Sequence, residues 1–253
     1  MDQTSSSSRF LTFHTGRCGS TVLSHLLNKH AGVLNDGEIF EQSYKNALGK
    51  GSSLPPIEFL QERMAHAASR GKIYGCEVKL IRGTHLDTVG TTQAAAPQLF
   101  HDAGIDKFVL LHRRNHLDRI VSQLVAIERK SYVLRNGDDA EIPKFNLPLK
   151  QVRVGKGTYT LLDAIEMFDQ DQNALRQGLE DAELPYIELV YEDDILNDPN
   201  TAVRKIADFI GFDFQPQPSE LRKVVSKSKD EFILNFDEIH RTLENTPYAW
   251  MLS

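Results

Sequence analysis

The chain has 253 residues and a formal net charge of -6, from 29 lysines and arginines against 35 aspartates and glutamates. This length suits one large α/β domain, and the acidic balance disfavours a nucleic-acid binder, which normally carries a basic surplus. No apolar run reaches the roughly 18 residues that span a bilayer. Two cysteines exclude a disulfide scaffold, and no cluster has metal-ligand spacing, so we expect a cytoplasmic enzyme without a metal.

Strand and helix patterns alternate along the chain, which predicts an α/β fold with three layers: a central parallel sheet flanked by helices. Residues 1–8 are polar and serine-rich and predict a short disordered tail, with one domain over residues 9–253. In chain order the pattern predicts a strand at 9–14, a helix at 21–30, a helix at 54–69, a strand at 72–81, a helix at 96–103, a strand at 107–112, a helix at 116–129, a helix at 159–179, a strand at 185–191 and a helix at 201–210. Residues 130–157 lack periodicity, and a loop of this length is usually a lid or binding insertion.

The turn after the first predicted strand is the first candidate site. It reads T-G-R-C-G-S-T-V and opens a helix, whose unpaired N–H groups and dipole favour an anion. Gly16 and Gly19 allow close backbone approach, Ser20 and Thr21 add hydroxyl donors, and Arg17 adds a guanidinium that binds oxyanions. This combination suits a phosphate or sulfate group, and a plain glycine turn with a Ser/Thr cap is the alternative.

Other phosphate-site motifs fit this turn poorly. A Walker A loop needs a lysine and four residues between its glycines, and this turn has neither. Cys18 at the start of a helix could be an activated thiolate. A cysteine-dependent phosphatase would require an arginine six residues further on, where Ser24 stands.

The second candidate site follows the strand predicted at 107–112. Asn115 is a plausible N-cap with Asp118 three positions later, as in a capping box. Arg114 lies at the start of the following helix, and Ser122 shares a helix face with Asp118. A second phosphate could bridge Arg114 and Ser122, although a solvated serine on a helix is the more common arrangement.

Together the two motifs resemble those of the PAPS-dependent sulfotransferases, which use 3′-phosphoadenosine 5′-phosphosulfate (PAPS) and release PAP. The resemblance rests on T-G-R-C-G-S-T-V-L, followed by R-x7-S about ninety residues later. The stretch 189–214 and the tail N-F-D-E-I…T-P-Y-A-W-M-L also match. The resemblance spans nearly the whole chain, with 130–157 covered least. Arg17 stands where the steroid and phenol enzymes carry lysine, which points to the bacterial and carbohydrate-type branch and its P-loop-like fold.

The resemblance assigns binding roles residue by residue. The loop for the 5′-phosphosulfate comprises Thr15, Gly16, Arg17, Cys18, Gly19, Ser20, Thr21 and Val22. Arg114 and Ser122 would hold the 3′-phosphate. A basic tail patch would close over that phosphate, unless it is a solvated face: Arg222, Lys223, Lys227 and Lys229.

The implied reaction is in-line transfer of the sulfuryl group to a hydroxyl or amine, and it needs a base to accept the acceptor's proton. Glu38, in N-D-G-E-I-F, is the first candidate because carbohydrate-type relatives carry a glutamate there; an exposed loop carboxylate is the alternative. His85 is the second candidate, unless it is structural, and Lys79 could contact the sulfuryl group. His14, His112 and His116 flank the motifs and receive no role.

Two other functions stay open at this point. A P-loop nucleotide kinase or NTPase would bind ATP and ignore PAP, and a non-catalytic module would bind PAP without transferring a group. The acidic balance disfavours a polyanionic glycan, so the expected acceptor is a neutral or cationic small molecule such as a sugar or secondary metabolite. We expect its specificity to depend on residues 130–157 and 40–44.

Overall fold

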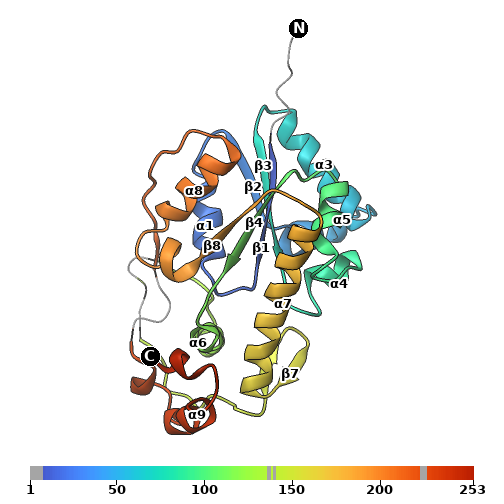
Figure 1. Ribbon diagram of the computed structural model, residues 1–253. Coiled ribbons are helices and arrows are strands. Elements are labelled where there is room, and N and C mark those ends of the chain that lie inside the picture. The colour runs from blue at the N-terminus through green and yellow to red at the C-terminus, as the bar shows by residue number, and fades with distance from the viewer. Residues whose placement is uncertain (1–7, 136–137, 139–140, 223–226) are drawn as a thin grey trace.

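The computed structural model describes residues 8–135, 138, 141–222 and 227–253 (Figure 1). Within these residues, five parallel strands form one sheet in the order β2-β3-β1-β4-β8. The strands are β1 (Arg9–His14), β2 (Val33–Glu38), β3 (Ile73–Lys79), β4 (Lys107–His112) and β8 (Tyr186–Val190). This confirms the predicted α/β fold class. The strand order, with a glycine turn after the central strand, is P-loop-like.

The central strands are apolar because helices cover both faces of the sheet. β1 reads R-F-L-T-F-H and β4 reads K-F-V-L-L-H, and every position after the first is buried. Parallel strands that are buried on both faces have this composition. The sequence predicts both strands with their observed bounds for this reason.

Helices pack on the two faces of the sheet. They are α1 (Ser20–Leu27), α2 (Tyr44–Gly49), α3 (Pro56–Ala68), α4 (His85–Val89), α5 (Ala96–Asp102), α6 (His116–Glu128), α7 (Leu161–Asp181), α8 (Asn200–Ile210) and α9 (Phe236–Leu243). In Figure 1, α1 and α8 cover one face, and α3, α5 and α7 lie on the other. Phe10 packs with Leu23 and Ile206 on the first side. Phe13 packs with Phe100 on the second.

A third apolar cluster lies below the sheet, where α6, α7 and α9 meet (Figure 1). Ile142, Leu147 and Val152 from the predicted insertion are buried in it. Short elements complete the fold: the strand pair β5 (Leu134–Arg135) and β9 (Leu221–Arg222), the hairpin β6 (Val152–Val154) and β7 (Gly157–Tyr159), the π-turns Ile39–Ser43 and Tyr191–Ile195, and the 3₁₀ turns Lys229–Glu231 and Ala249–Leu252. Among the described residues, none of the helices combines the length and apolar character that a membrane crossing needs.

The structure contains regular elements that the sequence pattern does not predict, among them α2 and α4. The pattern does not predict β2, because V-L-N-D-G-E is polar and the strand lies at an edge of the sheet, with a register shift between Asn35 and Glu38. Residues 130–157, expected to lack regular structure, contain β5 and β6, and their apolar side chains join the core.

Candidate functional site

The candidate site lies along the edge where the parallel strands end. In open α/β sheets this edge forms the ligand crevice, because the loops after neighbouring strands meet there. Here it gathers Glu38 at the end of β2, Lys79 at the end of β3, His14 at the end of β1 and Arg113 directly after β4. The three predicted segments, the glycine turn, the N-D-G-E-I-F stretch and R-x7-S, therefore face one crevice.

The glycine turn has a left-handed backbone at three positions. Gly16, Arg17 and Gly19 have φ angles of 73°, 55° and 87°. A Cβ on Gly19 would stand 2.7 Å from Cγ2 of Ile195 and 3.2 Å from Cδ2 of Tyr191. The turn thus needs glycine at position 19 both for its backbone angle and for the close approach of the 191–195 turn.

Arg119, on α6, holds the glycine turn through hydrogen bonds to its backbone. Its side chain is buried, and its Nε donates to the carbonyl oxygens of Thr15 and Gly16, each at 3.0 Å. Its guanidinium lies 3.6 Å from the ring centroid of Phe168. Burial lowers the pKa of Arg119 to about 9, so it is still a cation at neutral pH. The sequence places Arg119 with Arg113 and Arg114 in a basic cluster before Ser122, but it does not predict that Arg119 is buried and holds the turn.

A cavity of about 340 Å³ lies in front of the turn. Its walls come from the turn and α1, from Arg113 before α6 and Ser122 within it, and from the segments 132–134, 191–199 and 219–221. Nε of Arg17 donates to Oγ of Ser122 at 3.2 Å, and Nη1 donates to the carbonyl of Tyr132 at 3.0 Å. The two sequence motifs therefore touch each other through Arg17 and Ser122. Four of the predicted loop residues line the cavity beside Arg17: Gly19, Ser20, Thr21 and Val22.

Arg113, rather than Arg114, faces this cavity beside Ser122. Arg114 is half exposed, and its guanidinium binds both carboxylate oxygens of Asp193, at 2.9 and 2.5 Å. Arg113 is buried, donates to Oδ2 of Asp118 at 2.7 Å and lies 4.6 Å from the ring centroid of Tyr191. Sequence reasoning did not single out Arg113, because adjacent arginines give no signal of which one points inward.

The tail patch lies partly within the described residues. Nζ of Lys229 donates to Oδ1 of Asp118 at 2.9 Å. Lys227 and Lys229 line a smaller cavity of about 150 Å³ together with Arg113. Arg222 contributes its backbone to β9, and Lys223 lies outside the described residues.

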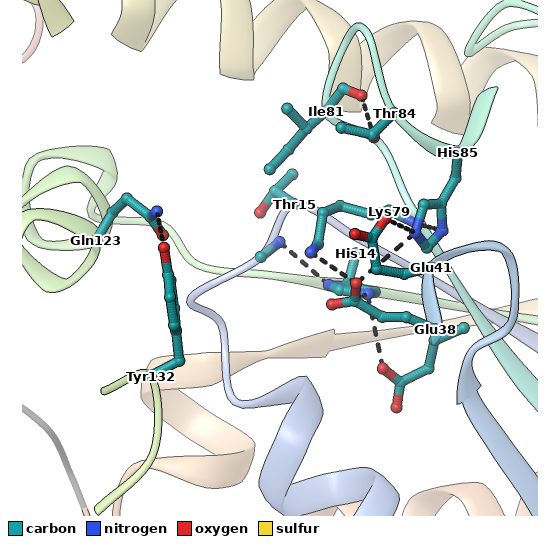
Figure 2. Close-up of polar contacts among 12 residues, drawn as sticks. His14, Thr15, Glu38, Glu41, Lys79, Ile81, Thr84, His85, Gln123 and Tyr132 are labelled. Carbon is teal, nitrogen blue, oxygen red and sulfur yellow. Dashed lines mark hydrogen bonds and ion pairs between the residues drawn. The ribbon is translucent and has the colours of Figure 1, made fainter. Parts of the chain in front are cut away.

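The predicted base Glu38 lies among three nitrogen groups (Figure 2). Its Oε2 is 2.7 Å from Nζ of Lys79 and 3.7 Å from Nε2 of His85. Its Oε1 is 3.8 Å from Nε2 of His14. About a quarter of the Glu38 side chain is exposed, and Glu38 is not among the residues that line the 340 Å³ cavity.

His85 lies beside Glu38 as a neutral ring. Its side chain is buried, and its Nδ1 accepts a hydrogen bond from the backbone N–H of Lys79 at 3.0 Å. Burial, with the nearby charge of Lys79, lowers the pKa of His85 to about 4. The neutral ring therefore carries its hydrogen on Nε2, which faces Glu38.

Cys18 faces the interior. It is fully buried, and burial raises the pKa of its thiol to about 11. At neutral pH it is protonated and buried, unlike a reactive thiolate, which is exposed and has a lowered pKa.

The predicted insertion at residues 130–157 contacts the site at both of its ends. Residues 132–134 line the cavity of about 340 Å³, and Gly155 packs against Ile81 and Arg82, which follow β3.

Comparison with known proteins leaves the activity open. No family model matches the chain, and no curated protein matches it. Matched structures include a mouse sulfotransferase complexed with PAP, with a TM-score of 0.47 and 13% identity over 94% of this chain and 84% of that chain. A thymidylate kinase from Ehrlichia chaffeensis has a TM-score of 0.39 and 12% identity, over 79% of this chain and 98% of that chain. A sugar kinase from Janibacter sp. has a TM-score of 0.39 and 14% identity, over 81% of this chain and 94% of that chain.

Proposed function

We propose that the protein is a PAPS-dependent sulfotransferase that moves a sulfuryl group to a hydroxyl or amine of a small polar acceptor in the cytoplasm and releases PAP. The observation that carries this proposal is the contact between Arg17 and Ser122. It joins two oxyanion-binding motifs that lie 105 residues apart in the chain. A donor with phosphate groups at two ends of one nucleoside needs two such motifs on one cavity.

The lining of the large cavity fits a polyanionic nucleotide. Arg17 and Arg113 supply positive charge, and Ser20, Thr21 and Ser122 supply hydroxyl donors. Nε of Arg113 is buried and forms no hydrogen bond within the described residues, and it lies 3.6 Å from Oε1 of Glu192. We assign the 5′-phosphosulfate to the turn at 15–22 and the 3′-phosphate to Arg113 and Ser122, with Arg114 exposed beside them.

In this proposal, different residues stabilise the leaving group, accept the proton and position the base. When bound, PAPS supplies the activated sulfuryl group. The N–H groups at the start of α1 and the Arg17 guanidinium stabilise negative charge on the group that leaves. Glu38 accepts the proton of the acceptor hydroxyl or amine. Lys79 holds the Glu38 carboxylate at 2.7 Å, and in this proposal its ammonium group also contacts the sulfuryl oxygens.

The acceptor in this proposal is small and neutral overall. The charged groups around Glu38 are the carboxylate of Glu41 and the ammonium groups of Lys45 and Lys79, so acids and bases balance. Such a site favours hydroxyl-rich molecules such as sugars or polar secondary metabolites over strongly charged ones.

Calorimetry with PAP and with ATP, followed by transfer from ³⁵S-labelled PAPS to a panel of sugars, polyols and amines, tests the proposal. We expect PAP to bind and Glu38→Gln to lose transfer by about 100-fold or more while PAP affinity is retained, because a general base contributes about 10²–10⁴ in rate. Glu58→Gln, at an exposed position of α3, is the matched control. Binding of ATP with no response to PAP would replace the proposal with a kinase or NTPase, and PAP binding without transfer to any acceptor would indicate a binding module.

A further inference from the structure

A second carboxyl group is buried behind Glu38 and has no part in the reaction as described. Glu77 lies on β3 with 3% of its surface exposed. The titratable and charged groups around it are His14 on β1, Glu38 on β2, Lys79 and Cys76 on β3 and Cys18 in the turn, with Arg119 acting on His14 and Cys18 from α6. The nearby side chains of Ser24 and Asn35 favour its charged form, against the burial that disfavours it. A carboxyl group in such a place is costly to ionise.

His14 connects Glu77 with Glu38. The ring is fully buried, and its Nδ1 accepts a hydrogen bond from the backbone N–H of Gly16 at 3.1 Å. Burial and the positive charge of Lys79 lower the pKa of His14 well below its usual range. The ring is therefore neutral, and its one hydrogen is on Nε2.

This single N–H faces two carboxyl groups. Nε2 of His14 lies 3.6 Å from Oε2 of Glu77 and 3.8 Å from Oε1 of Glu38. Among the described residues, no atom satisfies Nε2 within hydrogen-bonding distance, although it is buried. A small shift of the ring or of either carboxyl group would complete one of the two bonds, and one hydrogen serves one carboxylate well.

The protonation state of Glu77 decides between them. Burial, with the charge of Glu38, raises the pKa of Glu77 to about 8. While it is protonated, Glu77 competes weakly for the N–H, and the charged carboxylate of Glu38 attracts it. Once Glu77 loses its proton to solvent, two negative groups compete for one N–H.

We propose that Glu77 is a positioning residue that acts through His14: as a neutral acid it leaves the Nε2–H of His14 to Glu38 and so fixes the direction in which Glu38 faces the acceptor. This inference rests on the proposed role of Glu38 as the base. The same ring also holds the N–H of Gly16, so His14 ties the base to the anion-binding turn.

Two measurements test the coupling. The first follows the histidine ring nitrogens of the wild-type protein by ¹H–¹⁵N correlation NMR between pH 6 and 10 and needs no activity. We expect the Nε2 resonance of His14 to move in one step with a midpoint near the pKa of Glu77, about 8. The step should vanish in Glu77→Gln, which has the shape of the neutral acid, and persist in the control Glu58→Gln.

The second measurement is kcat against pH. In the wild type, kcat should fall in one step through that midpoint to a lower plateau, because ionised Glu77 competes with Glu38 for the N–H of His14 without removing the base. In Glu77→Gln it should stay within about twofold of its plateau over the same range. An active enzyme whose alkaline limb is the same in Glu77→Gln, or a His14 resonance that does not titrate in the wild type, overturns the inference alone. A protein that neither binds PAP nor transfers sulfuryl at any pH overturns the proposed function, and the positioning role with it.

Discussion

Replacing Gly19 with alanine tests whether the anion-binding turn depends on close packing against the 191–195 turn. Gly19 has a φ of 87° and Gly51 a φ of 91°, but only Gly19 is crowded: its Cβ would meet Ile195 at 2.7 Å, whereas a Cβ on Gly51 meets nothing within 4 Å. Alanine in a left-handed conformation costs about 1–2 kcal/mol at either position. Overpacking adds about 1–3 kcal/mol at position 19 alone.

The free energy of unfolding should therefore fall by about 2–5 kcal/mol in Gly19→Ala and by about 1–2 kcal/mol in Gly51→Ala. Urea unfolding followed by circular dichroism measures both, and calorimetry with PAP measures the consequence for the site. PAP affinity should fall about tenfold or more in Gly19→Ala, since displacement of the turn moves its N–H groups, and stay unchanged in Gly51→Ala.

A double-mutant cycle with Ile195→Ala locates the cause. Removing the Ile195 side chain eliminates both of its close contacts with the methyl group that Gly19→Ala adds. Gly19→Ala should therefore lower the free energy of unfolding by about 1–2 kcal/mol less in the Ile195→Ala protein than in the wild type. Equal destabilisation by Gly19→Ala and Gly51→Ala, or additive costs in the cycle, would refute the packing argument.

Three further results are expected. Arg113→Ala should weaken PAP binding by about tenfold or more in calorimetry, and Arg114→Ala by less than about threefold, because a buried charge-assisted contact is worth more than an exposed one; the reverse order would return the 3′-phosphate to Arg114. The pKa of Glu77 is about 8 in the folded protein against 4.5 for an ordinary glutamate, so the proton is held more tightly in the folded state. The stability it contributes is complete below pH 4.5 and is lost as pH rises to about 8, by at most about 5 kcal/mol; urea titrations should show this fall in the wild type and a flatter curve in Glu77→Gln. The thiols of Cys18 and Cys76 are buried and their pKa values are raised, so iodoacetamide at pH 8 should label neither in the folded protein, and rapid labelling of Cys18 would contradict its burial.

The parts of the fold that the sequence predicts well are those in which burial is expressed as composition. The central strands are continuous apolar runs, and α6 begins where Asn115 caps it, with its side chain accepting from the N–H of Asp118 at 2.8 Å as predicted. α8 ends at Ile210 before Gly211, which has a φ of 93°. Caps and breakers act over a few residues, so one sequence is sufficient to find them.

The remaining features depend on tertiary contacts. β2 is a strand because it pairs with β3, and its own residues are mostly polar. The direction of Arg114 is set by Asp193, which lies 79 residues away in the chain. His14 looks unremarkable as the last residue of a strand, and it gains meaning when Gly16, Glu38 and Glu77 surround it. No local pattern carries such long-range information.

The central position of β1 divides the crevice along the chain as well as in space. In the proposed reaction, the acceptor groups Glu38 and Lys79 come from β2 and β3 on one side of β1, and the donor groups come from segments after β4 and β8 on the other. Glu38 and Lys79 thus come from one contiguous stretch, residues 33–85, and the donor groups, apart from the turn at 15–22, come from later ones. Variation at residues 40–44, within that stretch, should therefore change the preferred acceptor without altering any segment that lines the nucleotide cavity.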